Sequence, residues 1–240
     1  MKRSYLFRLL IPVVLFIPCT LSAQGKYPNE GMPIRDLDGN VYRIIKTRSG
    51  VWMAENLRTS KLNDGTPLPL IKNNREWDYT KTAAYGWYKS TAEYAETYGA
   101  IYNWYAVETG KLCPKGWHVP TEEEWLDLME NAGSGQRSRN NAAKLKEAGT
   151  AHWKAPNEGA TNEIFFTALP AGEVSFAYSD EKAGTKTSWW TSMEDRSDLN
   201  PGESASNANN VGLSYDFLSS SEGSFNKKSA LPVRCKMNEE

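Results

Sequence analysis

The pattern of apolar and polar positions first predicts a short β-hairpin. Residues 41–46 form a β-branched, apolar run, and residues 51–54 form a second one. Between the runs, Arg48-Ser49-Gly50 supplies a glycine, which readily adopts the positive φ that a tight turn requires.

In the middle of the chain, the apolar residues have the spacing of a helix. From Tyr94 onward, aromatic and apolar residues recur at the spacing of one helix face, which predicts an amphipathic helix over residues 91–107 with its aromatic stripe in the core. Residues 63–88 before it have little periodicity and predict a long irregular loop with short strands.

The clearest local signal is a helix start at residues 120–125. Thr121 has the side chain of an N-cap, and Glu124, three residues later, completes a capping box. This helix is expected to end at Gly133, and a second short helix is expected over residues 141–148, before Gly149.

Short apolar runs dominate the rest of the chain and predict β-strands. They cover residues 164–169, 174–178, 188–191, 211–217 and 231–237. Because the helices precede these strands and do not alternate with them, the pattern indicates an α+β fold, a single compact domain over residues 31–240. Residues 195–210 and 219–229 are polar and predict exposed loops of the kind that carry recognition.

The first residues predict export. Residues 1–23 combine an early positive charge, an apolar run of about 13 residues and a small residue, Ala23, which is typical of a cleaved signal peptide and too short to span a membrane. Residues 24–30 then form a short linker. Cys19 raises the alternative of a lipid anchor, but the residues before it, Phe16 to Pro18, do not suit lipoprotein processing.

The charge balance and the cysteine content indicate which partners and which disulfide bonds to expect. The chain has 28 Lys and Arg against 29 Asp and Glu, so nucleic acid is not an expected partner. Without residues 1–23 two cysteines remain, Cys113 and Cys235. In an oxidising compartment they most simply form one disulfide, and two buried free thiols are the alternative.

Catalytic and metal motifs are not found. The two histidines, His118 and His152, have no ligand spacing, and no nucleophile elbow or phosphate-binding glycine loop occurs. Asp36, Asp38 and Asn40 resemble the start of a calcium loop, but the glycine and distal glutamate of an EF-hand are missing, so they are interpreted as turn residues. Calcium is therefore possible but unsupported by a motif, and no cofactor is expected.

Two groups of residues remain as candidates for a site. Adjacent residues of a strand face opposite sides, so one ring of Trp189-Trp190 could stand on the surface as a stacking platform, and burial of both is the alternative. Scattered carboxylates could serve a carbohydrate-active enzyme, although each suits a solvated surface acid better. These nominal candidates are Glu158, Glu173, Glu194, Asp195 and Asp198.

Seven sequence blocks, in order along the chain, together resemble the Fibrobacter succinogenes major paralogous domain family. They are DLDGNVY (36–42), VWMAENLR (51–58), YGAIYNWYAV (98–107), LCPKGWHVPT (112–121), FTALPAG (166–172), SWWTS (188–192) and VRC (233–235). The resemblance implies bacterial export and membership of the C-type-lectin-like superfamily, which also holds formylglycine-generating-enzyme-like domains, with a compact mixed fold and long C-terminal loops.

Known functions of that superfamily do not transfer to this chain, because its reactive cysteine pair, histidine triad and calcium-lectin motifs have no counterpart here. We therefore expect a non-enzymatic, secreted or surface-located module that binds a glycan or a surface protein. An envelope assembly component and an enzyme that uses scattered carboxylates are the alternatives. The candidate ligand-binding residues are Trp189, Trp190, Asp195, Asp198, Asn207, Asn209 and Asn210.

Overall fold

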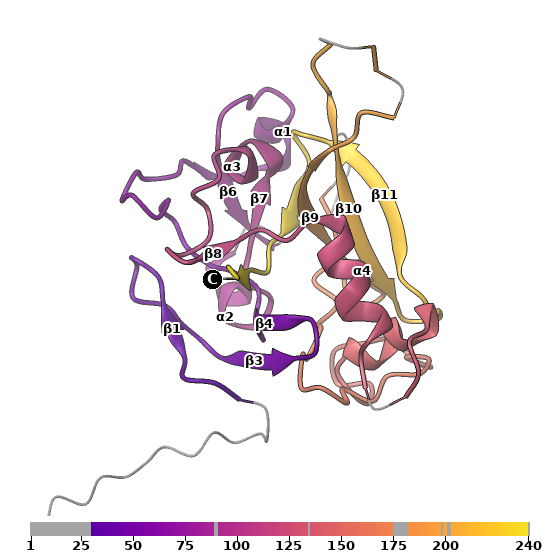
Figure 1. Cartoon of the computed structure of the whole chain (residues 1–240). Helices are drawn as coiled ribbons and strands as arrows, with labels where there is room; N and C mark the ends of the chain where they lie inside the picture. Colours follow the sequence, from indigo (N-terminus) through magenta and orange to yellow (C-terminus); the bar gives the residue numbers. More distant parts are fainter. Residues whose placement is uncertain are drawn as a thin grey trace, which may run out of the picture.

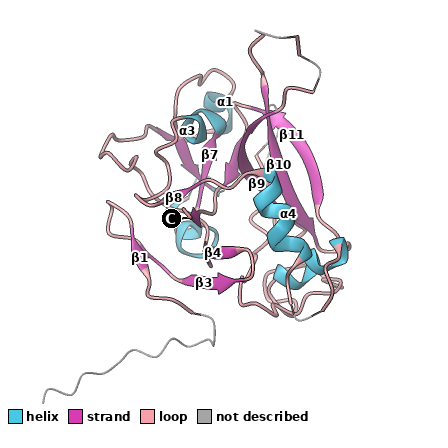
Figure 2. Ribbon diagram, in the orientation of Figure 1, coloured by secondary structure: helices cyan, strands magenta, loops and turns pink. Residues whose placement is uncertain are grey.

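The computed structural model describes residues 30–88, 91–133, 135–174, 182–197, 199–200 and 203–239. The predicted signal peptide with Cys19 and nearly all of the linker lie outside these residues. Within them the chain forms several small sheets with a few short helices, which confirms the α+β class (Figures 1 and 2). Among the described residues no helix has the length and apolar character to cross a membrane.

The predicted hairpin is confirmed and belongs to a four-stranded antiparallel sheet. The strand order is β3-β4-β13-β8. Its strands are β3 (Ile44–Thr47), β4 (Gly50–Met53), β8 (Trp117–His118) and β13 (Lys236–Met237). Ahead of it, β1 (Ile34–Arg35) pairs with β2 (Val41–Tyr42) around a turn in which Asp36 accepts from the amides of Asp38 and Asn40, as expected of turn residues.

The helix predicted for residues 91–107 is wrong. The chain forms η2 (Ala92–Tyr94) and α2 (Ala95–Tyr98), then strand β7 (Ala100–Asn103) and helix α3 (Trp104–Glu108). Gly99, with φ 79°, ends the helix, and a Cβ there would lie 2.6 Å from Asn56 Cβ. The close approach lets the Ala100 amide donate to the Leu57 carbonyl, so pairing across the fold overrides helical periodicity.

β7 is a central strand of the second four-stranded sheet, whose order is β12-β7-β6-β5. The partners are β5 (Leu70–Ile71), β6 (Tyr85–Trp87) and β12 (Ala230–Pro232). Residues 63–88, predicted as irregular with short strands, thus contribute β5, the short helix α1 (Asn74–Trp77) and β6.

The capped helix is confirmed as α4 (Glu122–Glu130), with both hydrogen bonds of the capping box between Thr121 and Glu124. The helix expected at 141–148 is instead a 3-10 helix, η3 (Arg139–Leu145), which packs against α4. The strand expected at 164–169 is absent, because these described residues make turns and a single bridge between Ala168 and Lys146. Of the strand expected at 174–178, only Val174 is described, as a bridge to Ala230.

The C-terminal sheet corrects the predicted loops. Its order is β11-β10-β9, formed by β9 (Lys186–Glu194), β10 (Asn207–Ser214) and β11 (Ser221–Asn226). The polar segments expected to be loops therefore supply the start of β10 and all of β11, the edge strand of this sheet (Figure 1). Residues 221–224 of β11 are exposed. The polar composition of these segments correctly predicted exposed residues, but it did not predict that the residues pair as strands.

β9 lies between the two main clusters of buried apolar residues, and this arrangement buries both of its tryptophans. Trp189 belongs to the cluster under α4, where it stacks on Trp125 with 4.9 Å between the ring centroids. Trp190 points to the other side, into the cluster around β7 and the disulfide. The side chains of β9 alternate between its two faces as expected, but both faces of the strand are covered by other parts of the chain.

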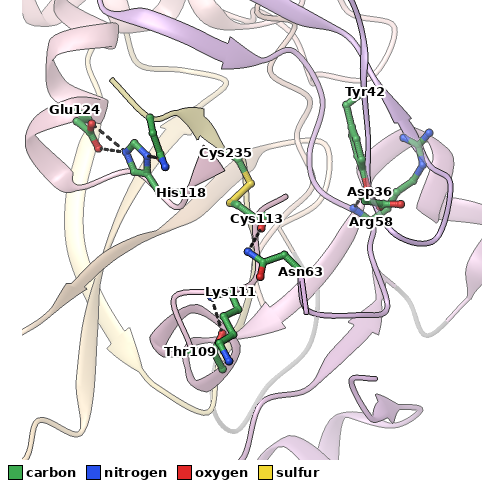
Figure 3. The surroundings of a disulfide bond; sticks show 11 residues. Asp36, Tyr42, Arg58, Asn63, Thr109, Lys111, Cys113, His118, Glu124 and Cys235 are labelled. Carbon is green, nitrogen blue, oxygen red and sulfur yellow. Dashed lines mark hydrogen bonds and ion pairs between the residues drawn. A yellow bond between two sulfur atoms is a disulfide. The ribbon is translucent and has the colours of Figure 1, made fainter. Parts of the chain in front are cut away.

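The disulfide between Cys113 and Cys235 confirms the expected pairing and ties the last strands to the middle of the chain. Figure 3 shows the bond in the protein interior, with Asn63 donating to the Cys113 carbonyl at 2.9 Å. Both cysteines are buried, so the bond is part of the core.

We expect the disulfide to contribute much of the stability. It closes a loop with a sequence separation of 122 residues, and removal of a native disulfide costs about 2–5 kcal/mol. The double variant Cys113→Ser/Cys235→Ser should lower the free energy of unfolding by that amount in denaturant titrations. A variant as stable as the oxidised wild type would contradict this role.

A buried lysine gives the stability a pH dependence. Lys146 is fully buried at the end of η3, and its ammonium donates to the carbonyls of Ser214 and Phe217 at 2.8 and 3.3 Å. Burial lowers its pKa to about 8. Since the unfolded chain holds this proton up to about pH 10.4, protonation opposes folding below pH 8 and that cost is relieved as the pH rises.

We therefore expect the free energy of unfolding to gain a contribution that increases between about pH 8, the pKa of Lys146 in the folded chain, and about pH 10.4, its pKa in the unfolded chain. Its slope should be at most about 1.4 kcal/mol per pH unit, the value for one proton. The variant Lys146→Met removes the titrating group, so the difference between wild type and variant in urea titrations should change with pH. Parallel pH profiles would refute the assignment.

Candidate functional site

A buried arginine lies where the chain passes from one sheet to the other. The strand expected over residues 231–237 is interrupted, and Arg234 lies between β12 and β13. The residue is 2% exposed. Its guanidinium lies 4.0 Å above the Phe166 ring centroid and 5.7 Å from that of Trp189. Aromatic faces therefore supply the surroundings of this cation.

Asn56 fixes the arginine and the tryptophan together. Its Oδ1 accepts a hydrogen bond from Trp189 Nε1 at 2.9 Å and another from Arg234 Nε at 3.1 Å. Its Nδ2 donates to the Tyr98 carbonyl at 2.9 Å, which attaches helix α2. Each of these three hydrogen bonds of the Asn56 side chain thus joins it to a different part of the chain.

A loop with unusual backbone geometry supports the other side of the arginine. Phe165 and Thr167 have φ values of 60° and 54°, in the left-handed region that these residues rarely adopt. Asn162 holds this geometry, since its side chain accepts from the Thr167 amide at 2.7 Å and donates to Thr167 Oγ1 at 2.9 Å. The result presents both the Phe166 ring and the Phe166 carbonyl to Arg234, whose Nη1 donates to that carbonyl at 2.7 Å.

Arg234 and Asn56 line a pocket of about 360 Å³ that opens to solvent. This volume is within the range of small-ligand sites. The remaining lining residues come from β2 and the position after it, from the segment that follows β4, from α2 and from the loop that carries Phe166. They are Val41, Arg43, Ala54, Glu55, Arg58, Glu96, Thr97, Thr167 and Leu169.

The charged side chains on the wall have partners of their own. Arg43 Nε forms an ion pair with Glu55 at 2.9 Å. Arg58 lies over the Tyr42 ring, 5.0 Å from its centroid, and donates to the Val41 carbonyl at 3.1 Å. Tyr42 in turn donates to Asp36, as Figure 3 shows, and burial raises the pKa of its hydroxyl. These contacts hold the wall of the pocket in one geometry.

Arg234 itself has no such partner. Among the described residues, no carboxylate lies within ion-pair distance of its guanidinium; its hydrogen bonds go to Asn56 and to the Phe166 carbonyl. Burial lowers its pKa to about 9, and the more distant charge of Glu55 offsets part of that effect. Removing an uncompensated charge from water is costly, so an arginine in this position requires either a structural or a ligand-binding explanation.

The tryptophans predicted as a surface anchor are not available for stacking. Trp189 and Trp190 are both 0% exposed. Trp189 donates to Asn56, and Trp190 donates to the Tyr102 carbonyl at 2.7 Å. The hypothesis of an exposed ring is wrong and its alternative, burial of both rings, is confirmed, because helix α4 covers one face of β9 and the β7 region covers the other.

The other predicted ligand-binding residues do not converge on one site. Asp195 and Asn207 are on the surface near the start of β10, where the Asp195 amide donates to the Asn207 carbonyl. Asn209 is half-buried and donates to Glu122 of α4 at 2.9 Å, while Asn210 is buried. Asp198 lies outside the described residues.

Two of the nominal carboxylates, Glu173 and Glu194, are held in ion pairs. Glu173 is buried and pairs with Lys182 and Lys186, and Glu194 pairs with Lys227 and Arg196. Glu158 contributes its amide, which donates to the Tyr215 carbonyl. None of these described acids lines the Arg234 pocket.

His118 is hydrogen-bonded through both of its ring nitrogens. Its Nε2 contacts both carboxylate oxygens of Glu124, the capping acid of α4 (Figure 3). Its Nδ1 lies 2.7 Å from Asn238 Oδ1. Across the described part of the chain, no three His, Cys, Asp or Glu side chains are grouped so that they could hold a metal ion.

Sequence patterns did not reveal Asn56 or Arg234 as site residues. Both lie inside blocks that carried the family resemblance, at residues 51–58 and 233–235. One signal was present: an arginine directly between Val233 and Cys235 in a run otherwise expected to be a buried strand. A charge at such a position points to a specific partner.

The family comparison agrees with the resemblance. A family model described as the Fibrobacter succinogenes major domain matches residues 45–235. The matched span includes Asn56, Trp189, Arg234 and both disulfide cysteines. No curated protein and no solved structure matches the chain.

Loss of the Asn56 side chain should destabilise the fold. Asn56→Ala leaves two buried donors, Trp189 Nε1 and Arg234 Nε, without their shared acceptor, and we expect a loss of about 2–4 kcal/mol in the free energy of unfolding. The control Asn207→Ala, at an exposed asparagine, should change it by less than about 0.5 kcal/mol. Equal effects of the two variants in denaturant titrations would refute the role of Asn56.

Proposed function

The chain belongs to the Fibrobacter succinogenes major domain family, and we propose that it is an exported, non-enzymatic binding module that recognises a glycan or a protein at the cell surface. The observation that carries this proposal is the pocket over Arg234. A solvent-open cavity whose floor is a rigid, buried cation is suited to holding a ligand group in one orientation.

Binding is favoured over catalysis by the chemistry of the pocket wall. The described lining residues include no histidine, cysteine, serine, lysine or aspartate. Of the two glutamates, Glu55 is engaged with Arg43 and Glu96 is exposed on α2. General acid–base or nucleophilic catalysis needs a titratable pair or an activated nucleophile within reach of the ligand. Of the two carboxylates on this wall, that of Glu55 is held in an ion pair with Arg43, and the described lining residues include no activated nucleophile.

Export rests on the first residues and on the disulfide. Residues 1–23 have the composition of a signal peptide, and a disulfide suits an oxidising compartment outside the cytoplasm. The proposal includes a secreted or surface location, and it includes the assignment of the domain to the C-type-lectin-like superfamily. That assignment is supported by the mixed α+β class and the capped helix that starts at Thr121.

We place recognition at the Arg234 pocket in preference to the C-terminal segments. The tryptophans that would have anchored a ligand near those segments are buried. Much of the polar sequence there is engaged in pairing of β10 and β11. The loop between β9 and β10 is the rival location, and the experiment below separates the two.

The test is binding of mature protein, residues 24–240, to an array of immobilised glycans and extracellular proteins. The variant Thr97→Trp places a large side chain on the pocket rim, at an exposed residue of α2. We expect it to abolish the array signals of the wild type without changing the thermal unfolding midpoint. Its matched control is Thr66→Trp, at an exposed threonine that does not line this pocket.

A second variant tests the loop. Asp195→Ala/Asn207→Ala should retain the array signals, because these surface residues do not line the pocket. Signals lost in this variant but kept in Thr97→Trp would place recognition at the loop and overturn the pocket assignment. An array without any signal for the wild type would contradict the binding module itself.

A further inference from the structure

The Arg234 guanidinium has hydrogen-bonding capacity that the protein does not use. Nε donates to Asn56 and Nη1 donates once, to the Phe166 carbonyl. A guanidinium carries five N–H donors, and among the described residues no acceptor is found for Nη2 or for the second N–H of Nη1. The side chain is 2% exposed and lines the pocket, so its remaining donors are available only from there.

The charge balance of the pocket leaves that cation uncompensated. The other charged lining residues are two arginines, Arg43 and Arg58, and two glutamates, Glu55 and Glu96. Their formal charges cancel, so the net charge of the lining is the single positive charge of Arg234. A planar guanidinium binds a carboxylate through parallel hydrogen bonds, which are stronger than neutral ones, and does so best in a partly desolvated site.

The other lining residues favour a ligand that carries hydroxyl groups and an apolar face as well as a negative charge. Glu96 is an exposed, acceptor-only group, Glu55 already accepts from Arg43, and Thr97 and Thr167 contribute hydroxyls. Such a wall suits a ligand that brings hydroxyl donors next to its carboxylate. Val41, Ala54 and Leu169 provide apolar surface for the C–H face of a saturated ring. A peptide C-terminus would bring the carboxylate without the neighbouring hydroxyls.

We propose that the pocket binds the uronic acid residue of an acidic polysaccharide, with the carboxylate on Arg234 and the ring hydroxyls directed to the glutamate and threonine side chains. This inference rests on the proposed binding function and narrows it to one class of ligand. The strained loop over residues 162–168 is part of this binding site. It positions the Phe166 ring and carbonyl, which hold the Arg234 guanidinium in place before a ligand binds.

The first experiment titrates the wild-type protein with galacturonate, with galacturonic acid methyl ester and with galactose. We expect galacturonate to bind with a Kd in the millimolar range, as is common for one monosaccharide, and about tenfold or more tightly than the ester or galactose. The ester retains the shape of the uronate and lacks its charge, so it is the matched control. Calorimetry gives the affinities, and added salt should weaken only the uronate.

Nuclear magnetic resonance of the arginine side-chain N–H groups locates the binding without a variant. Galacturonate should shift the Arg234 guanidinium signals, assigned with Arg234→Lys, and leave those of an exposed arginine such as Arg48 unchanged. The variant Thr97→Trp should remove both the shift and the calorimetric signal. Because this substitution is on the exposed rim, its loss of binding does not depend on a change in the core.

Three results would overturn the inference. They are equal affinity for the ester and the uronate, uronate binding that survives in Thr97→Trp, and no binding of galacturonate or glucuronate at concentrations on the order of tens of millimolar. A neutral array ligand that is lost in Thr97→Trp would remove the uronate assignment and leave the binding module in place. Failure of every ligand at the pocket would remove both.

Discussion

One amide oxygen joins the parts of this fold that are distant in sequence. Asn56 Oδ1 accepts from Trp189 of the C-terminal sheet and from Arg234 between the last two strands, while the same side chain donates to the end of α2. All these groups are buried or half-buried, so their bonds exclude water and few other arrangements satisfy them. The position of the guanidinium, and with it the floor of the pocket, depends on this single residue.

Local rules predicted the elements whose cause is local. The capping box fixed the start of α4, and the glycine turn fixed the β3–β4 hairpin, because in both cases the decisive bonds join residues a few positions apart. The helix predicted through Gly99 was wrong for the opposite reason. There the backbone must pass within contact of Asn56, and pairing with β6 and β12 outweighs a helical pattern of aromatic residues.

The candidate site was less accessible to sequence reasoning than the fold. Burial of Trp189 and Trp190 follows from what covers each face of β9, which no local pattern reports. Arg234 and Asn56 lie 178 positions apart and meet only in the folded chain. The alternation of the two tryptophans and the turn role of Asp36 were predictable, because both depend on neighbouring residues alone.

The order of the elements along the chain also determines at which stage of synthesis the native topology can form. β12 completes one sheet, β13 lies between β4 and β8 in another, and Cys235 and Arg234 stand between them. Until residues 230–237 have emerged, both four-stranded sheets lack a strand, the core cluster around β7 lacks Leu231, Val233 and Cys235, and Asn56 lacks a donor. A nascent chain therefore acquires its native topology only after residues 230–237 have been synthesised.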